Sequence, residues 1–128
     1  MTPEELLPAV IEKAGLPSAR QHLFLCLGPD CCSPEMGQLS WDYLKQQVAR
    51  LNLQVLRTRA ACFRICSQGP ILLVYPDGIW YARVTPERLQ RILNEHIQLR
   101  QPVQEWILHH NPLQSSQTPE LPLPGMDH

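Results

Sequence analysis

The 128-residue sequence lacks the features that mark several large classes of protein. It contains no G-x-x-x-x-G-K and no G-x-S-x-G, so it has neither a phosphate-binding loop nor a hydrolase nucleophile elbow. Its net charge is only −1, from 11 basic and 12 acidic residues, which argues against a nucleic-acid-binding surface or a polybasic membrane patch. No apolar run approaches the ~20 residues of a membrane-spanning helix. We therefore expect no nucleic-acid partner and no membrane insertion.

The N-terminal segment lacks the positive charge of a signal peptide. MTPEELLPAVIEKAG is acidic instead, and no cleavage-like run of small residues follows it. We therefore expect a soluble, cytoplasmic protein, with enough residues for one domain. In that reducing compartment an odd count of five cysteines does not indicate a disulfide framework. Cysteines at this density indicate metal binding or redox chemistry.

Apolar patterns predict the order of the first three elements of the domain. HLFLCL (22–27) and LQVLRTR (53–59) have the length and residue types of strands. Between them, Ser40 is expected to cap a helix. The apolar residues of that helix recur every three or four positions and form one buried stripe: Trp41, Leu44, Val48 and Leu51.

The second half of the domain predicts a hairpin and a helix. Pro-Asp-Gly at 76–78 joins two apolar runs, and Gly78 can take the positive φ that such a turn requires. Thr85 and Pro86 then begin a helix with a buried face. That face comprises Leu89, Ile92, Leu93 and Ile97. A β-α-β unit followed by a β-hairpin and a helix is the order of an α/β, thioredoxin-like fold, with a mixed sheet and flanking helices.

Two terminal segments are expected to lie outside the folded domain of residues 21–110. Residues 1–20 form a helical extension and linker, in which Pro8 should shorten or kink the helix that Thr2 and Pro3 begin. Residues 111–128 are rich in proline, without periodicity, and are expected to form a flexible tail. Before that tail, Pro102 should begin a short helix or turn.

The five cysteines fall into two groups. Cys26, Cys31 and Cys32 lie near the end of the first strand, and Cys62 and Cys66 follow the second. A β-α-β topology brings both loops to the same end of the sheet, where four thiolates would form a cage suited to zinc or an iron–sulfur cluster. The gaps of four and three residues do not exclude zinc. The sequence has no C-x-x-C and no C-x4-C-x2-C, so the thioredoxin dithiol and the plant-type cluster motif are absent.

The segments HLFLCLGPDCC and AACFRICSQGPILLVYPDGIWYARVTPERLQRILNEHI resemble the thioredoxin-like 2Fe–2S ferredoxins. More distantly, they are similar to the small iron–sulfur subunit of the peripheral arm of respiratory complex I. The family pattern is a strand ending in C-x4-C or a longer gap, a helix, a second strand and C-x3-C. An apolar strand, Tyr-Pro-x-Gly and a final helix opened by TPE follow. The resemblance covers residues 22–98.

The resemblance implies a site and a function. It makes Cys26, Cys31, Cys62 and Cys66 the ligands of one 2Fe–2S cluster, in a homodimer that shuttles single electrons between redox partner proteins and is not an enzyme. Cys32 has no counterpart in the family pattern. Arg57, Arg59 and Arg64 lie close to the second pair in sequence and could stabilise the cluster's negative charge.

Two other functions remain open from the residues alone. One is a structural zinc module with four cysteine ligands that mediates protein contacts. The other is a thiol-based redox sensor in which Cys32 oxidises with Cys31 or with Cys66.

Overall fold

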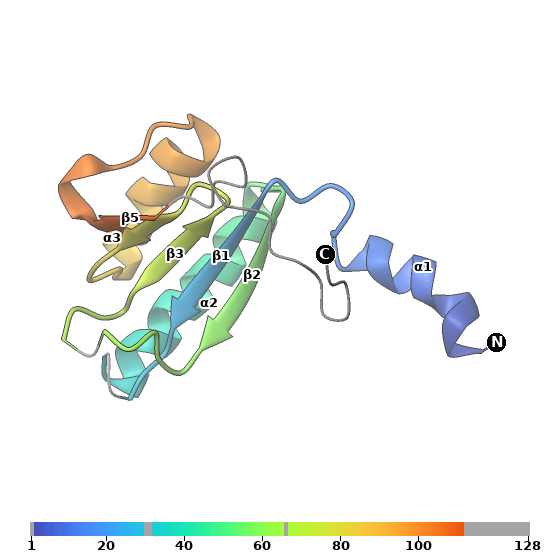
Figure 1. Cartoon of the computed structure of the whole chain (residues 1–128), viewed down its shortest axis with the longest axis horizontal. Coiled ribbons are helices and arrows are strands. Elements are labelled where there is room, and N and C mark those ends of the chain that lie inside the picture. Colours follow the sequence, from blue (N-terminus) through green and yellow to red (C-terminus); the bar gives the residue numbers. More distant parts are fainter. Residues whose placement is uncertain (1, 30–31, 66, 112–128) are drawn as a thin grey trace, which may run out of the picture.

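The computed structural model of the chain describes residues 2–29, 32–65 and 67–111, and Figure 1 shows its elements in chain order. The predicted tail beyond Asn111 lies outside these residues. In the described ranges, no helix is long and apolar enough to cross a membrane. The helices and strands are α1 (Pro3–Lys13), β1 (Gln21–Cys26), α2 (Pro34–Arg50), β2 (Val55–Ala60), β3 (Leu72–Tyr75), β4 (Ile79–Tyr81), α3 (Pro86–Ile92), a π-helical turn η1 (Leu93–Gln98), a 3₁₀ turn η2 (Gln104–Trp106) and β5 (Ile107–His110).

The strands form one mixed sheet in the order β2-β1-β3-β4-β5. β1 and β2 are parallel and joined by α2, whereas the other neighbouring pairs are antiparallel. The β3–β4 hairpin turns at 76–78, where Gly78 has a φ of 74°. This arrangement confirms the predicted thioredoxin-like α/β fold and its β-α-β, hairpin, α order.

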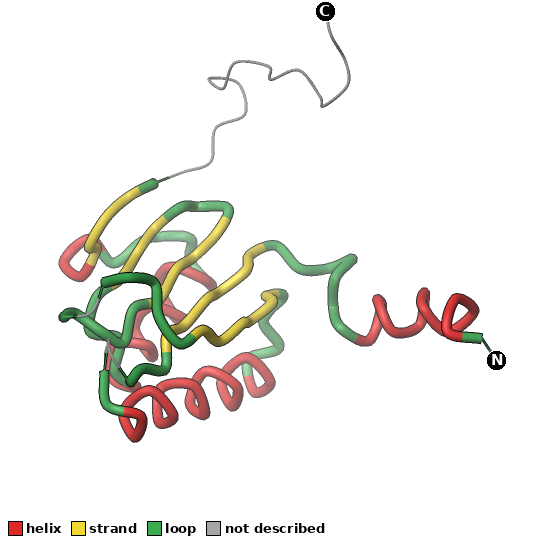
Figure 2. Tube along the Cα trace, turned by 60° about the horizontal axis from the view of Figure 1, so that its bottom comes forward, coloured by secondary structure: helices red, strands yellow, loops and turns green. Residues whose placement is uncertain are grey.

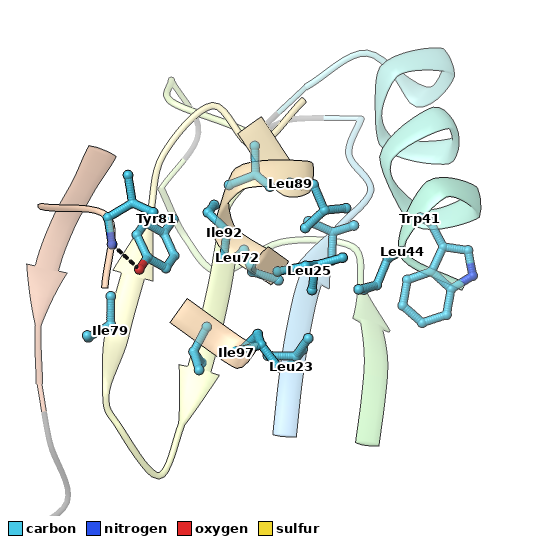
Figure 3. Close-up of a cluster of buried hydrophobic side chains, with 14 residues drawn as sticks. Leu23, Leu25, Trp41, Leu44, Leu72, Ile79, Tyr81, Leu89, Ile92 and Ile97 are labelled. Atoms are coloured by element: carbon cyan, nitrogen blue, oxygen red, sulfur yellow. Dashed lines mark hydrogen bonds between the residues drawn. The ribbon is translucent and has the colours of Figure 1, made fainter. Parts of the chain in front are cut away.

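One face of the sheet is covered by helices and carries the main core. Figure 3 shows Leu23 and Leu25 of β1 against Leu44 of α2, and Leu72 of β3 beside Leu89 and Ile92 of α3. Their burial follows from the period-2 pattern of the strands and the three-to-four spacing of the helices. We call this side the helix-covered face, and the opposite side of the same sheet the open face.

The predicted start of α2 was wrong. The helix begins at Pro34, and its cap is Ser33, whose hydroxyl accepts a hydrogen bond from the Met36 N–H at 3.2 Å. Ser40 lies inside the helix, fully buried, and donates its hydroxyl to the Val84 carbonyl at 2.7 Å. A serine inside a helix is tolerated when its hydroxyl finds a partner of this kind, so the apolar stripe alone located the helix but not its first turns.

Two further expectations at the ends of the domain were incomplete. α1 runs without interruption from Pro3 to Lys13 with Pro8 inside it, because its first turns are exposed and water can reach the carbonyl that Pro8 leaves without a donor. The turn after Pro102 is the 3₁₀ turn η2, and it leads into an edge strand, β5, that the sequence did not predict. β5 pairs with β4 and contains His109 and His110, both exposed.

Candidate functional site

The two cysteine-bearing loops leave the sheet from the same edge. In the parallel β1–β2 pair, Cys26 is in register with Ala60, the last residue of β2. The Leu27 N–H then donates to the Ala60 carbonyl at 2.8 Å and ties the start of the first loop to the start of the second. Cys62 follows two residues later. The predicted juxtaposition of the two loops is therefore confirmed.

Cys26 is the best-defined thiol of the site. Its side chain is fully buried, and its sulfur accepts a hydrogen bond from the Ile71 N–H at 3.0 Å. The Cys26 N–H in turn donates to the Ile71 carbonyl at 3.1 Å. The residue is thus held by the backbone just before β3, and its sulfur has a fixed N–H donor.

Cys62 presents a second thiol of the same kind on the other loop. Its sulfur accepts the Arg64 N–H at 3.0 Å, while the residue itself is exposed. Arg64 adopts a φ of 67°, which turns the backbone so that its N–H points back to the sulfur. Backbone N–H donors to sulfur are typical of cysteines that ligate iron–sulfur clusters, because they stabilise the negative charge on the ligands.

Cys32 lies close to Cys26, with its sulfur near the Cys26 backbone. It is half-buried, and its sulfur is 4.0 Å from the Cys26 carbonyl oxygen. Gly28, with a φ of 89°, allows this close return of the loop, because a Cβ there would collide with the Cys32 carbonyl. The other two predicted ligands, Cys31 and Cys66, lie outside the described residues. In the part of the chain that is described, no three His, Cys, Asp or Glu side chains gather to hold a metal ion.

A small apolar cluster supports the site on the open face. Its buried members are Cys26, Ile71 and Leu73. Phe63 and Ile65 from the second cysteine loop pack against it, with the Phe63 and Trp80 rings 6.2 Å apart in an edge contact. The loop that contains Cys62 is therefore anchored by its own apolar side chains, on either side of Arg64.

The arginines predicted near the site have different surroundings. Arg57 lies over the Trp41 ring of α2, 5.4 Å from its centroid, and so belongs to the helix-covered face. Arg59 and Arg64 are both exposed, and of these Arg64 lies within the cysteine loop.

A buried polar chain on the helix-covered face was missed by sequence reasoning. The Val103 N–H donates to the Tyr81 hydroxyl at 3.0 Å, and this hydroxyl is hydrogen-bonded to His96 Nδ1 at 2.7 Å. His96 Nε2 lies 2.6 Å from an Asp77 carboxylate oxygen. Burial, the largest cause, raises the pKa of Tyr81 to about 12. His96 looks like any polar residue in a helical pattern, so no signal in the sequence marked it.

The donor set at the edge of β1 and β2 fits an iron–sulfur cluster. Thiol sulfurs on two adjoining loops, one buried and one exposed, each with a backbone N–H donor, provide soft ligands and the hydrogen bonds that such a cluster needs. Carboxylate or imidazole ligands would instead indicate a different metal.

Comparison with known proteins agrees with this geometry. The chain is 32% identical over 88 residues to a 2Fe-2S ferredoxin from Clostridium pasteurianum, which covers 62% of this chain and 86% of that protein. It is 34% identical over 59 residues to a 2Fe-2S ferredoxin from Aquifex aeolicus (strain VF5), over 46% of this chain and 53% of that protein. No protein-family model matches the chain.

Solved structures show the same fold. The structure of a thioredoxin-like [2Fe-2S] ferredoxin from Aquifex aeolicus superposes with a TM-score of 0.66 at 24% identity and covers 74% of this chain and 96% of that one. A crystal structure of the wild-type protein gives a TM-score of 0.64 at 25% identity, over 71% of this chain and 98% of that one. By its identity to the clostridial protein along most of that protein's length, the chain belongs to the 2Fe-2S ferredoxin family.

Proposed function

We propose that the chain carries one 2Fe–2S cluster ligated by Cys26, Cys31, Cys62 and Cys66. The observation that supports this most directly is the pairing of β1 with β2, which starts both cysteine loops at one edge of the sheet. Cys26 and Cys62 each have a backbone N–H donor there. Cys31 and Cys66 complete the set by their spacing, and residues 21–110 form the domain that would hold the cluster.

The proposed role is one-electron transfer between redox partner proteins in the cytoplasm, with no catalysis by the chain itself. The bound cluster supplies the one-electron chemistry. Cys26 and its apolar neighbours exclude water from the inner side of the site, while the exposed loop around Cys62 leaves the outer side accessible to a partner. Ile71 and Arg64 hold the two sulfurs through their N–H groups. We also expect a homodimer, with residues 1–20 and 111–128 outside the cluster domain.

The decisive experiment is spectroscopic. Anaerobically purified protein should be red-brown, should bleach under dithionite, and should then give a paramagnetic resonance signal from about one reduced cluster per chain. A colourless protein with one equivalent of zinc would make the chain a structural zinc module instead. A metal-free protein that loses free thiols under peroxide would make it a thiol sensor.

Single substitutions test the ligand set. Cys26→Ser should abolish the visible absorption, because it replaces a buried sulfur ligand, and Cys31→Ser should do the same. Cys32→Ser is the matched control in the same loop and should keep the wild-type spectrum. If Cys32→Ser loses the cluster while Cys31→Ser keeps it, the fourth ligand is Cys32 and the proposed set is wrong by one residue.

A further inference from the structure

A hollow of about 640 Å³ lies at the end of the sheet opposite the cysteine loops. It is lined by Arg20, which directly precedes β1, and by Val55, the first residue of β2, whereas the cysteine loops leave from the other ends of these strands. The β3–β4 turn contributes Pro76 and Asp77. Figures 1 and 2 show from two directions that α1 stands away from the sheet, so it does not fill the hollow. The volume is within the roughly 300–1,000 Å³ of small-molecule sites.

Arg20 and Arg100 place two positive charges in the hollow. Among the described residues, their guanidinium groups make no ion pair and no hydrogen bond. Other arginines of the chain are held by a neighbouring side chain: Arg50, Arg57, Arg83, Arg88 and Arg91. Because a guanidinium group matches the geometry of phosphate and carboxylate oxygens, the pair in the hollow can bind an anion.

Asp77 adds a carboxylate that is held from the protein side. His96 Nε2 lies 2.6 Å from its Oδ2, and Gln21 Nε2 donates to the same oxygen at 3.2 Å. His96 is 1% exposed and is hydrogen-bonded to the buried Tyr81 hydroxyl. Within the described ranges, Asp77 Oδ1 has no hydrogen-bond partner, and the side chain is 30% exposed. The carboxylate is therefore fixed in place, with one oxygen available to a hydroxyl group of a ligand.

The rest of the lining narrows the kind of ligand. Side-chain amides can both donate and accept hydrogen bonds, and the hollow has four: Gln21, Asn52, Gln54 and Gln98. Two arginines against one carboxylate leave the lining net positive when His96 is neutral. A ligand that matches this lining carries an anionic group for the arginines and hydroxyl groups for Asp77 and the amides.

We propose that the hollow binds a small phosphate ester that carries free hydroxyl groups, such as a sugar phosphate. The phosphate oxygens accept hydrogen bonds from Arg20 and Arg100, and a hydroxyl group donates to Asp77 Oδ1. A phosphate ester has three terminal oxygens, so it can accept from both arginines at once. The inference goes beyond the proposed function and does not rest on it, since no cysteine lines the hollow.

The first test is isothermal titration calorimetry of the full-length holoprotein at low ionic strength, with ribose 5-phosphate and glucose 6-phosphate as probes. One equivalent per chain should bind saturably, and added salt should weaken binding because it screens the charges. Inorganic phosphate offers the charge alone and ribose the hydroxyl groups alone, so each should bind at least about tenfold more weakly than ribose 5-phosphate. No saturable binding of either ester up to about 10 mM, or equal affinity for the esters and inorganic phosphate, would overturn the proposal.

The second test removes the charges one at a time. Arg20→Gln and Arg100→Gln should each weaken ribose 5-phosphate binding by about tenfold or more, because each loses a charge-assisted hydrogen bond. Arg59→Gln is the matched control, an exposed arginine at the cysteine end of β2, and should bind as wild type does. Wild-type affinity in either hollow variant, or an equal loss in the control, would contradict the site.

Asp77→Asn distinguishes recognition of the hydroxyl group from general damage to the hollow. It should weaken ribose 5-phosphate binding while inorganic phosphate binds at least as tightly as to wild type, because a negative charge is removed beside the anion. Equal weakening of both ligands would contradict the role given to Asp77. Circular dichroism reports the fold of this variant, and if it does not fold, the arginine variants and their control decide. The visible spectrum reports the cluster separately, so a colourless protein that binds the esters would overturn the proposed function alone.

Discussion

The two faces of the single sheet differ sharply in how they are built. Among the residues that the structure describes, the helix-covered face holds fourteen buried hydrophobic side chains from strands and helices alike, whereas the buried cluster on the open face has three, one of which is Cys26. The first face therefore supplies most of the hydrophobic free energy of folding. The second has half-buried rings, a loop anchored by two side chains, and the candidate cysteine site at its edge.

This difference separates stability from function in a small domain. Side chains on the helix-covered face are interlocked, so changes there should lower the stability of the folded protein while leaving the chemistry of the site unchanged. The cysteine loops depend on a few backbone contacts, such as the Ile71 N–H to Cys26 and the tight return at Gly28. Changes there should alter the site while the fold persists.

The largest expected effect is on the helix-covered face. Leu25→Ala removes a fully buried side chain and should lower the free energy of unfolding by about 2–5 kcal/mol. Leu56→Ala, on the open face of the neighbouring strand and half-buried, should cost about 1 kcal/mol. Anaerobic urea titrations of both variants in dilute solution measure the difference. Equal costs would show that the two faces contribute alike.

The next effect is expected at two glycines. Comparing them separates the cost of a positive φ from the cost of a steric collision. Gly28 and Gly15 both have a positive φ, 89° and 82°, which costs a non-glycine residue about 1–2 kcal/mol. A Cβ at Gly15 meets nothing within 4 Å, whereas one at Gly28 collides with the Cys32 carbonyl. Gly28→Ala should therefore lower the thermal midpoint more than Gly15→Ala, and only Gly28→Ala should lower the visible absorption per chain. Identical spectra for the two variants would show that the tight return at Gly28 does not matter for the site.

The same division explains what the sequence could predict. The strands, the hairpin at Gly78 and the helix after Thr85 follow from period and turn chemistry, because these signals are local. The pairing of the two cysteine loops followed from topology, since parallel strands joined by a helix must start their loops at one edge. β5 could not be predicted, because an edge strand with exposed His109 and His110 has no apolar alternation.

Other features depend on contacts between distant segments. The sequence predicts a helix cap at Ser40, because nothing local shows that its hydroxyl bonds to the Val84 carbonyl, 44 residues away in the chain. The Tyr81–His96 hydrogen bond joins a strand to the π-helical turn, and neither residue has a sequence signal for it. The N–H donor to Cys62 depends on the left-handed backbone of Arg64, which is not a residue that favours this conformation.

A smaller effect concerns the polar chain on the helix-covered face at high pH. Because burial raises the pKa of Tyr81 to about 12, the unfolded chain releases this proton before the folded one does. Wild type should therefore lose stability as the pH rises from about 10 to 12, by up to about 1.4 kcal/mol per pH unit from this group. Tyr81→Phe should be less stable at pH 7, by about 1–3 kcal/mol, because Val103 N–H and His96 Nδ1 lose their partner.

The measurement is the difference in unfolding free energy between wild type and Tyr81→Phe along this pH range. The difference should shrink toward pH 12, since the variant lacks the titrating hydroxyl while both proteins share every other group. A difference that stays constant would show that Tyr81 ionises alike in the folded and unfolded chains. The cluster spectrum at pH 7 should be the same in both, because Tyr81 and Cys26 belong to different buried clusters on opposite faces of the sheet.

The smallest effect is expected at Arg64, an exposed residue of the site whose side chain would act through its charge alone. Arg64→Ala keeps the backbone N–H that Cys62 accepts and removes only the cationic side chain. With the proposed cluster bound, loss of a nearby positive charge disfavours the added electron, so the reduction potential should fall. The fall should be less than about 59 mV, the tenfold step for a one-electron couple, because the side chain is exposed and screened by salt. Arg50→Ala, in the last turn of α2, is the matched control and should leave the potential unchanged. Voltammetry at low and high salt measures both; equal potentials for the two variants would leave the backbone N–H as the contribution of Arg64 to the site.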